Sequence, residues 1–178
     1  MKTMILFFSS ALLLGSLLAG NWKVDASKAK VQFSIKGPFG TVHGTFKGLT
    51  AEINFNEKSP SGGSITASID PNTVSTGIGL RNHDLKSKEE WLDTKKYPKI
   101  SFHSKRIEKA KDGFVAHGEL TLKDVTKPIE LPFTFTGKGN GGVFKGHFTI
   151  KRSDFHLGKP GGSVGEEITL DLEVPATR

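Results

Sequence analysis

The stretch GFVAHGELTLKDVTKPIELPFTF, residues 113–135, decides the fold because its apolar and small residues recur at every second position. The first run places Phe114, Ala116, Gly118, Leu120 and Leu122 on one face, and the second places Ile129, Leu131, Phe133 and Phe135 on one face. A period of two is typical of β-strands with one buried face. Lys123 and Asp124 lie between the runs and are turn formers. The stretch therefore predicts two antiparallel strands joined by a short turn.

The same alternation continues through the rest of the chain. Its apolar faces are Val31, Phe33 and Ile35; Val42, Gly44 and Phe46; Ala51, Ile53 and Phe55; Ile65, Ala67 and Ile69; Ile100 and Phe102; Phe144, Gly146, Phe148 and Ile150; and Ile168, Leu170, Leu172 and Val174. Turn formers separate the runs, as in Ser59–Gly63 and Gly139–Gly142. About eight strands joined largely by hairpins predict an all-β fold whose antiparallel sheet closes into a barrel, since closure removes exposed edges.

The inward face mixes large residues with small ones. Gly44, Ala67, Ala116, Gly118 and Gly146 alternate there with Phe and Ile. A barrel of about eight strands is either just filled by its side chains or holds one small ligand. Small residues fit both cases, because they leave room for a ligand and also accommodate larger neighbours. The pattern alone leaves the choice open, but anything held inside should be apolar.

Residues 79–104, GLRNHDLKSKEEWLDTKKYPKISFHS, interrupt the strand pattern. Ser87 followed by Glu90 forms a capping box, with Asp84 as an alternative cap one turn earlier. The pair Tyr97-Pro98 ends a helix. A helix this short needs tertiary contacts to be stable. We expect it to begin at Ser87 and to lie across one barrel opening, held by Leu85, Trp91 and Leu92, with Trp91 as a plug.

The sequence shows no pattern of nucleophilic catalysis or metal binding. It contains no Cys and no Gly-x-Ser-x-Gly, and its six His residues form no His-x-His or His-Glu-x-x-His arrangement. We therefore predict no catalytic residues, metal or cofactor. Two cations are better candidates for ligand contact, because Arg binds a diphosphate or carboxylate through paired hydrogen bonds. These are Arg81 and Arg152, although each has a neighbouring acid, Asp84 or Asp154, that would pair with it and fix a loop.

The N-terminus predicts export. Residues 1–20 combine an early Lys2 with an apolar run and end in Leu18-Ala19-Gly20, which is typical of a secretory signal peptide. Leu18-Ala19-Gly20 also resembles the end of a lipoprotein signal, but Asn21 stands where the lipidated Cys would be. We expect cleavage near Gly20, one domain over residues 21–178, no membrane span afterwards, and a periplasmic or secreted location. The net charge of +7 suits an anionic partner, and export argues against nucleic acid. A homodimer is compatible with the sequence.

Several short motifs together resemble the YceI-like family of exported bacterial lipid-binding proteins. They are Gly44-Thr45-Phe46-Lys47-Gly48-Leu49, Asp84-Leu85-Lys86-Ser87, Trp91-Leu92-Asp93, Tyr97-Pro98-Lys99-Ile100-Ser101-Phe102, Val125-Thr126-Lys127-Pro128, Arg152-Ser153-Asp154-Phe155 and Val164-Gly165-Glu166-Glu167-Ile168. The resemblance covers the chain from Trp22 to Glu173. One departure is Asp84, at a position where the family often has His.

The resemblance implies an extended lipocalin-like barrel that holds a long isoprenoid or a fatty-acid-like amphiphile. We expect the protein to bind, carry or store such a lipid without enzymatic activity. The expected tail-binding residues are Phe33, Ile35, Phe46, Ile53, Trp91, Phe102, Phe114, Phe133, Phe135 and Phe148. The expected head-group residues are Arg81, Asp84 and Arg152.

Two other functions compete with this hypothesis. One is an enzyme that modifies a lipid or amide at the barrel mouth, using Asp84, His83 or Glu167. It requires a polar cluster that points into the cavity. The other is a filled barrel that binds a protein partner, such as a stress-response factor.

Overall fold

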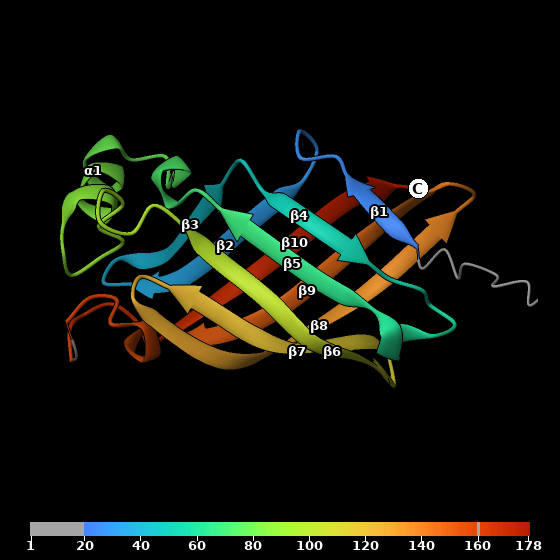
Figure 1. The fold of residues 1–178 in the computed structure, drawn as a ribbon. Helices are drawn as coiled ribbons and strands as arrows, with labels where there is room; N and C mark the ends of the chain where they lie inside the picture. The colour runs from blue at the N-terminus through green and yellow to red at the C-terminus, as the bar shows by residue number, and fades with distance from the viewer. Residues whose placement is uncertain (1–19, 160) are drawn as a thin grey trace, which may run out of the picture.

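A computed structural model describes residues 20–159 and 161–178, which form one antiparallel β-barrel (Figure 1). The predicted signal peptide lies outside the described residues except for Gly20. The strands are β1 (Asn21–Val24), β2 (Lys30–Gly37), β3 (Gly40–Phe46), β4 (Thr50–Asn54), β5 (Ser64–Ile69), β6 (Ile100–Ala110), β7 (Gly113–Leu122), β8 (Val125–Lys138), β9 (Gly141–Lys151) and β10 (Glu167–Thr177). The helices are α1 (Gly79–Ser87) and three 3₁₀ turns, η1 (Pro60–Gly62), η2 (Pro71–Thr73) and η3 (Arg152–Phe155).

Ten strand segments make an eight-stranded barrel because two of its strands are interrupted. Both β1 and β2 lie along β10, where Val24 pairs with Ala176 and Lys30 with Glu173. Likewise β3 pairs with β2, and β4 pairs with β1. Each remaining strand pairs with its successor, so the barrel runs up and down in chain order. The predicted eight-stranded antiparallel barrel is confirmed.

The strand β7 shows how the alternating sequence produces the wall. Its residues alternate strictly between partly buried and buried, and Phe114, Ala116, Gly118, Leu120 and Leu122 face inward as the sequence predicts. Its partner β8 pairs Phe133 with Phe114, which brings aromatic side chains together on the same face. Lys123 follows β7 with a φ of 58°, and the tight turn to β8 depends on this left-handed conformation.

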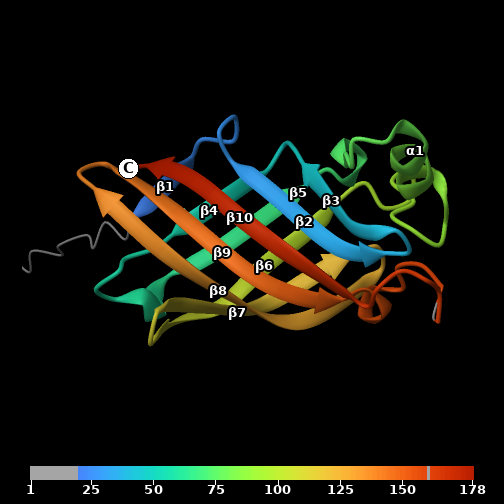
Figure 2. The ribbon, with the colours of Figure 1, turned by 180° about the vertical axis from the view of Figure 1, so that it is seen from behind.

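The barrel has two different ends, which Figures 1 and 2 show from opposite sides. The helix α1, the turn between β2 and β3, and η3 lie at one end, which we call the α1 end. The strand β1 and the C-terminus lie at the other, the far end. No helix among residues 20–159 and 161–178 combines the length and the apolar character needed to cross a membrane.

Both predicted bounds of the helix, its start at Ser87 and its end at Tyr97, are wrong. Ser87 is the last residue of α1 and not its N-cap, which is Ile78. The Ser87 hydroxyl donates to the carbonyl of His83, 2.9 Å away, so it cannot begin a new helix. The chain then turns back, because the amide of Leu92 donates to the carbonyl of Leu85 at 3.0 Å. Residues 89–97 are consequently a series of turns that fold over the end of α1.

Candidate functional site

The interior of the barrel contains a cavity of about 630 Å³. Its wall is formed by inward-facing residues from the strands, and its mouth at the α1 end is bordered by residues of α1 and the turns after it. Eight of the ten predicted tail-binding residues line it, namely Phe33, Ile35, Phe46, Ile53, Trp91, Phe102, Phe133 and Phe148. The structure adds aliphatic lining residues on the same strand faces, including Leu120, Leu131, Ile168, Leu170 and Leu172. Ligand pockets commonly have this size and apolar character.

Phe114 and Phe135 do not line the cavity. They pack instead around Phe55, which is fully buried, with ring centroids 4.8 and 5.4 Å from its own. Trp22 lies 4.9 Å from Phe135, and its indole N–H donates to the carbonyl of Phe55 at 3.0 Å. Edge-to-face contacts of this kind stabilise an aromatic cluster beyond the area that it buries. The cluster fills the far end of the barrel, so the cavity ends there.

The small inward-facing residues serve two different purposes. A Cβ added to Gly44 would lie 2.2 Å from the ring of Phe33, and one added to Gly118 would lie 2.7 Å from the ring of Phe102. These glycines are therefore covered by aromatic rings from the neighbouring strand. Gly146 has no atom closer than 3.4 Å to such a Cβ, and both Gly146 and Ala67 line the cavity. Both interpretations of the small residues are correct, each at its own positions.

All charged side chains in the cavity lining come from the α1 end. Asp84 lies on α1 and forms an ion pair of 2.8 Å with Lys88, one helical turn later. This pairing raises the pKa of Lys88. Arg81 is half-buried on the same helix and makes no ion pair with any described residue. Arg81 thus offers a guanidinium group to a ligand at the mouth of the cavity.

Arg152 has a different environment from Arg81. The residue is 2% exposed, and its guanidinium donates to the carbonyls of Leu157, Lys159, Val164 and Gly165 at 2.8–3.3 Å. The nearest carboxylate oxygen, on Glu166, is 3.8 Å away, and the ion pair with Asp154 considered above does not form. Arg152 therefore holds the loop between η3 and β10 in place, and its donors are occupied although it borders the cavity.

Trp91 lies in the turns after α1 and contacts the cavity with part of its ring. A Cβ added to Gly158 would lie 2.8 Å from this ring, so only a glycine fits beneath it. The amide of Gly158 also donates to the carbonyl of Glu90. Leu92, next to Trp91, is 7% exposed and anchors the segment. The turns and the loop after η3 thus pack against each other at the α1 end.

The residues proposed for an enzyme do not meet. His83 and Glu167 are exposed and absent from the cavity lining, whereas Asp84 lines it. Further along the barrel, the described His103, His117 and His147 side chains bond to polar groups of neighbouring strands on the outer surface.

Comparison with known proteins identifies a family model, the YceI-like domain, that matches residues 22–176. A UPF0312 protein from Yersinia enterocolitica is 33% identical over 173 residues, which cover 92% of this chain and 90% of that protein. The crystal structure of BcnA from Burkholderia cenocepacia superposes with a TM-score of 0.82 at 29% identity, covering 87% of this chain and 100% of that one. A polyisoprenoid-binding domain from Saccharophagus degradans shares the fold, with a TM-score of 0.68 at 16% identity and coverage of 88% and 97%.

Proposed function

Because the chain belongs to the YceI-like domain family, we propose that its barrel binds one amphiphilic lipid with a long apolar tail, either isoprenoid or fatty-acid-like. The tail occupies the cavity and the polar head lies at the α1 end. The observation that carries this proposal is the cavity of about 630 Å³, whose wall is apolar except at one end. The polyisoprenoid-binding neighbour of the same fold supports the choice of ligand class.

The energetics favour a tail over a polar ligand. Transfer of each CH₂ group from water into an apolar site contributes about 0.8 kcal/mol. A polar ligand would lose its hydrogen bonds to water and find few partners among residues such as Phe33, Phe102 and Leu131. The wall makes no contact that depends on one tail chemistry, so we expect the protein to accept related tails.

The head group is expected to lie beside Arg81 and Asp84, where Asp84 is already paired with Lys88 and Arg81 supplies the free charge. Arg81 is free of carboxylate partners among the described residues and borders the cavity, so it suits an anionic head such as a carboxylate or diphosphate. The occupied donors of Arg152 make it a support for the mouth. We therefore assign Arg152 to the shape of the site and Arg81 to direct contact.

The role that follows is non-enzymatic carriage or storage of the lipid in the bacterial cell envelope. The signal-like residues 1–20 support a periplasmic or secreted location. An apolar cavity that is open at one end only shields the tail from water and suits both roles.

The test is to purify the protein after export from a bacterial host, extract it with organic solvent and identify co-purified lipid by mass spectrometry. We expect an amphiphile with one long apolar tail. Repeated empty extracts, combined with no binding of a fluorescent fatty acid, would refute the proposal. For the head group, Arg81→Gln should weaken binding of a tail with an anionic head about tenfold, the size of one charge-assisted hydrogen bond. The same substitution should not change the affinity for the corresponding alcohol. Arg106→Gln, on the outer surface, is the matched control and should change neither affinity.

A further inference from the structure

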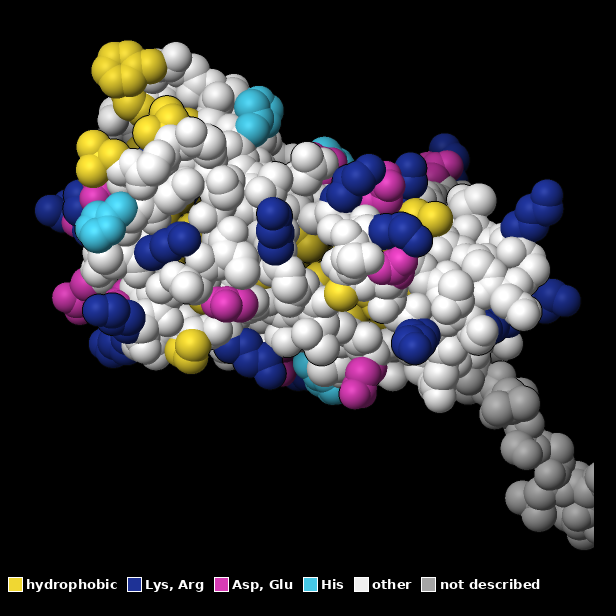
Figure 3. All heavy atoms as spheres, turned by 90° about the horizontal axis from the view of Figure 1, so that it is seen from above, with side chains coloured by type: hydrophobic (Ala, Val, Ile, Leu, Met, Phe, Trp, Pro, Cys, Tyr) yellow, Lys and Arg dark blue, Asp and Glu magenta, His cyan; other side chains and the backbone are white. Residues whose placement is uncertain are grey.

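Three large apolar side chains remain exposed on the folded protein. Among the described residues, these are Phe39 with an exposed fraction of 102%, Leu80 with 74% and Ile78 with 50%. Phe39 lies in the turn between β2 and β3, and Ile78 and Leu80 lie at the start of α1. All three belong to the α1 end, where hydrophobic side chains gather on the surface in Figure 3.

Folding does not explain why Phe39 is apolar. Gly37 pairs with Gly40, so only Pro38 and Phe39 form the loop of this hairpin. Turns of this length usually contain Asn, Asp or Gly at their centre. A fully exposed Phe gains nothing from the folded state by burial, so its apolar surface is available to a partner.

The exposed patch is continuous with the cavity. Residues Gly37–Val42 of this hairpin contribute to the lining, and Phe39 itself borders the mouth. On α1, Arg81 directly follows Leu80 and lines the cavity, and Leu85 lines it one helical turn later. Apolar surface therefore runs from the interior across the rim to the outside.

The two chain segments that carry the patch contain basic residues and no acidic ones. Residues 26–51, which include the hairpin, contain no Asp or Glu, and neither do residues 71–83, which include the start of α1. Lys36 and Arg81 flank the three apolar residues in the sequence and make no ion pair with described residues. The acidic residue of the cavity lining, Asp84, is already paired with Lys88. The tip therefore combines exposed apolar side chains with the cations Lys36 and Arg81, which are unpaired among the described residues, and this combination is complementary to an anionic lipid surface.

We propose that the α1 end docks on an anionic phospholipid bilayer, with Phe39, Ile78 and Leu80 inserted at the level of the head groups. The mouth of the cavity then faces the membrane, and an apolar tail can pass between bilayer and barrel without crossing water. The last step rests on the proposed function, whereas the docking itself rests on the exposed residues and their charges.

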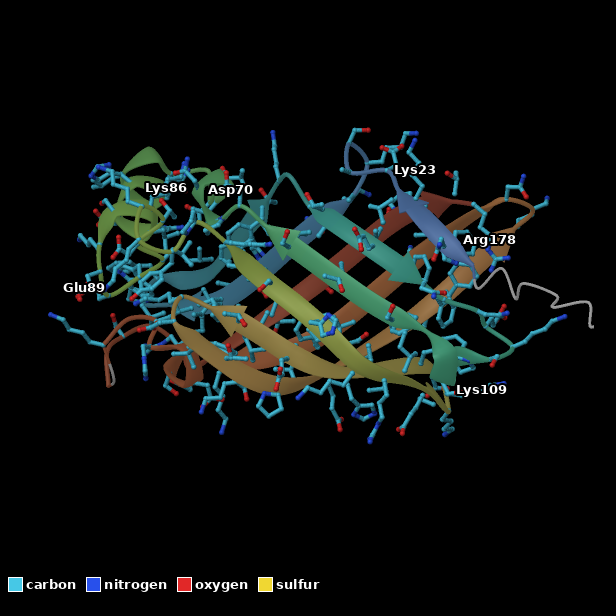
Figure 4. The ribbon with its side chains drawn as sticks, in the orientation of Figure 1. Lys23, Asp70, Lys86, Glu89, Lys109 and Arg178 are labelled. Atoms are coloured by element: carbon cyan, nitrogen blue, oxygen red, sulfur yellow. The ribbon has the colours of Figure 1, made fainter. Side chains whose placement is uncertain are left out.

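The experiment measures sedimentation of the exported protein with vesicles of phosphatidylglycerol and phosphatidylethanolamine, and with phosphatidylcholine vesicles as the neutral control. We expect binding to the anionic vesicles, weakened by salt. Phe39→Ser should weaken it about tenfold or more, because a buried Phe side chain contributes at least that factor. Lys36→Gln should weaken binding, but Lys109→Gln should not, since Lys109 lies at the far end (Figure 4).

Leu80→Gln separates docking from ligand binding. Leu80 is exposed and absent from the cavity lining, so this variant should bind a fluorescent fatty acid in solution as the parent does, while it binds vesicles less tightly. If the parent protein does not bind anionic vesicles, or if the Phe39→Ser variant binds them as tightly as the parent, the docking inference is wrong. The proposed function is then unaffected. Photo-crosslinking from Phe39 to an envelope protein, without vesicle binding, would also overturn the docking inference in favour of a protein partner. If the parent protein does not bind the fluorescent fatty acid, the proposed function is wrong instead.

Discussion

Shortening the cavity by one substitution should limit the length of tail that the protein accepts. Ala67 on β5 lines the cavity, and its neighbours across the sheet are Ala51 on β4 and Phe102 on β6. The two adjacent alanines leave space in the wall. Ala67→Leu adds three carbon atoms there, and the closed far end prevents the ligand from moving deeper.

The size of the effect follows from the displaced carbons. If three added carbons displace about three CH₂ groups of the tail into water, the free energy of binding becomes about 2.4 kcal/mol less favourable, because each CH₂ contributes about 0.8 kcal/mol. This corresponds to about sixtyfold weaker binding of a tail long enough to fill the cavity. A tail that stops short of Ala67 should bind equally well to both proteins. The substitution fills empty space, so we expect the midpoint of thermal unfolding to stay constant or to rise.

The assay is competition of a homologous series of fatty acids against a fluorescent fatty acid, with parent and variant compared at each chain length. Thr66→Leu is the matched control, because Thr66 neighbours Ala67 on the same strand and points outward, where it bonds to His103. Equal weakening at all chain lengths, or no weakening at any, would refute the location of the tail. A lower unfolding midpoint of Ala67→Leu would show that the space around Ala67 is already filled.

Three further predictions concern stability. Arg152→Lys should destabilise the fold by about 3 kcal/mol or more in urea unfolding, because a single ammonium cannot satisfy the buried carbonyls that the guanidinium binds. Gly118→Ala should lower the unfolding midpoint and Gly146→Ala should not, since the added Cβ meets a carbonyl oxygen at 2.4 Å in the first case and nothing closer than 3.4 Å in the second. Asp25→Asn should reduce stability near neutral pH and have little effect below pH 2; the hydroxyl of Ser27 lowers the pKa of Asp25 from 3.8 to about 2, so its stabilising charge is lost as pH falls through this range.

The barrel follows from the sequence because alternation in each strand fixes which face is buried. The prediction succeeds for β7 and its neighbours because side chains alternate between the two faces of a strand, whichever strand it pairs with. Alternation cannot give the depth of a residue along the barrel. Phe114 and Phe148 both face inward, yet Phe148 borders the cavity and Phe114 belongs to the aromatic cluster. Depth depends on the stagger between strands, which no single strand specifies.

The helix illustrates a local signal that tertiary contacts override. Ser87 and Glu90 have the spacing of a capping box, but the chain folds back after Ser87 so that Leu92 becomes buried. Burial of a Leu side chain contributes about 1.5–3 kcal/mol, whereas a cap contributes about 1 kcal/mol. Burial of Leu92 is therefore worth more than the cap, and the chain folds back after Ser87. Arg152 is a second case in which tertiary contacts decide the role of a residue. The sequence around Arg152 does not indicate that four backbone carbonyls surround its guanidinium.

The closed far end refines the expected selectivity for tails. An apolar wall without specific contacts discriminates weakly between tail chemistries, which predicts broad acceptance of short and medium tails. The aromatic cluster around Phe55 adds a floor to the cavity, and its buried rings can move only if the edge-to-face contacts with Phe114, Phe135 and Phe144 are broken. A tail that exceeds the cavity must therefore leave the carbons next to its head group outside the mouth. Affinity should rise with chain length until the tail reaches the floor and then level off, so chain length should affect affinity only for tails shorter than the cavity.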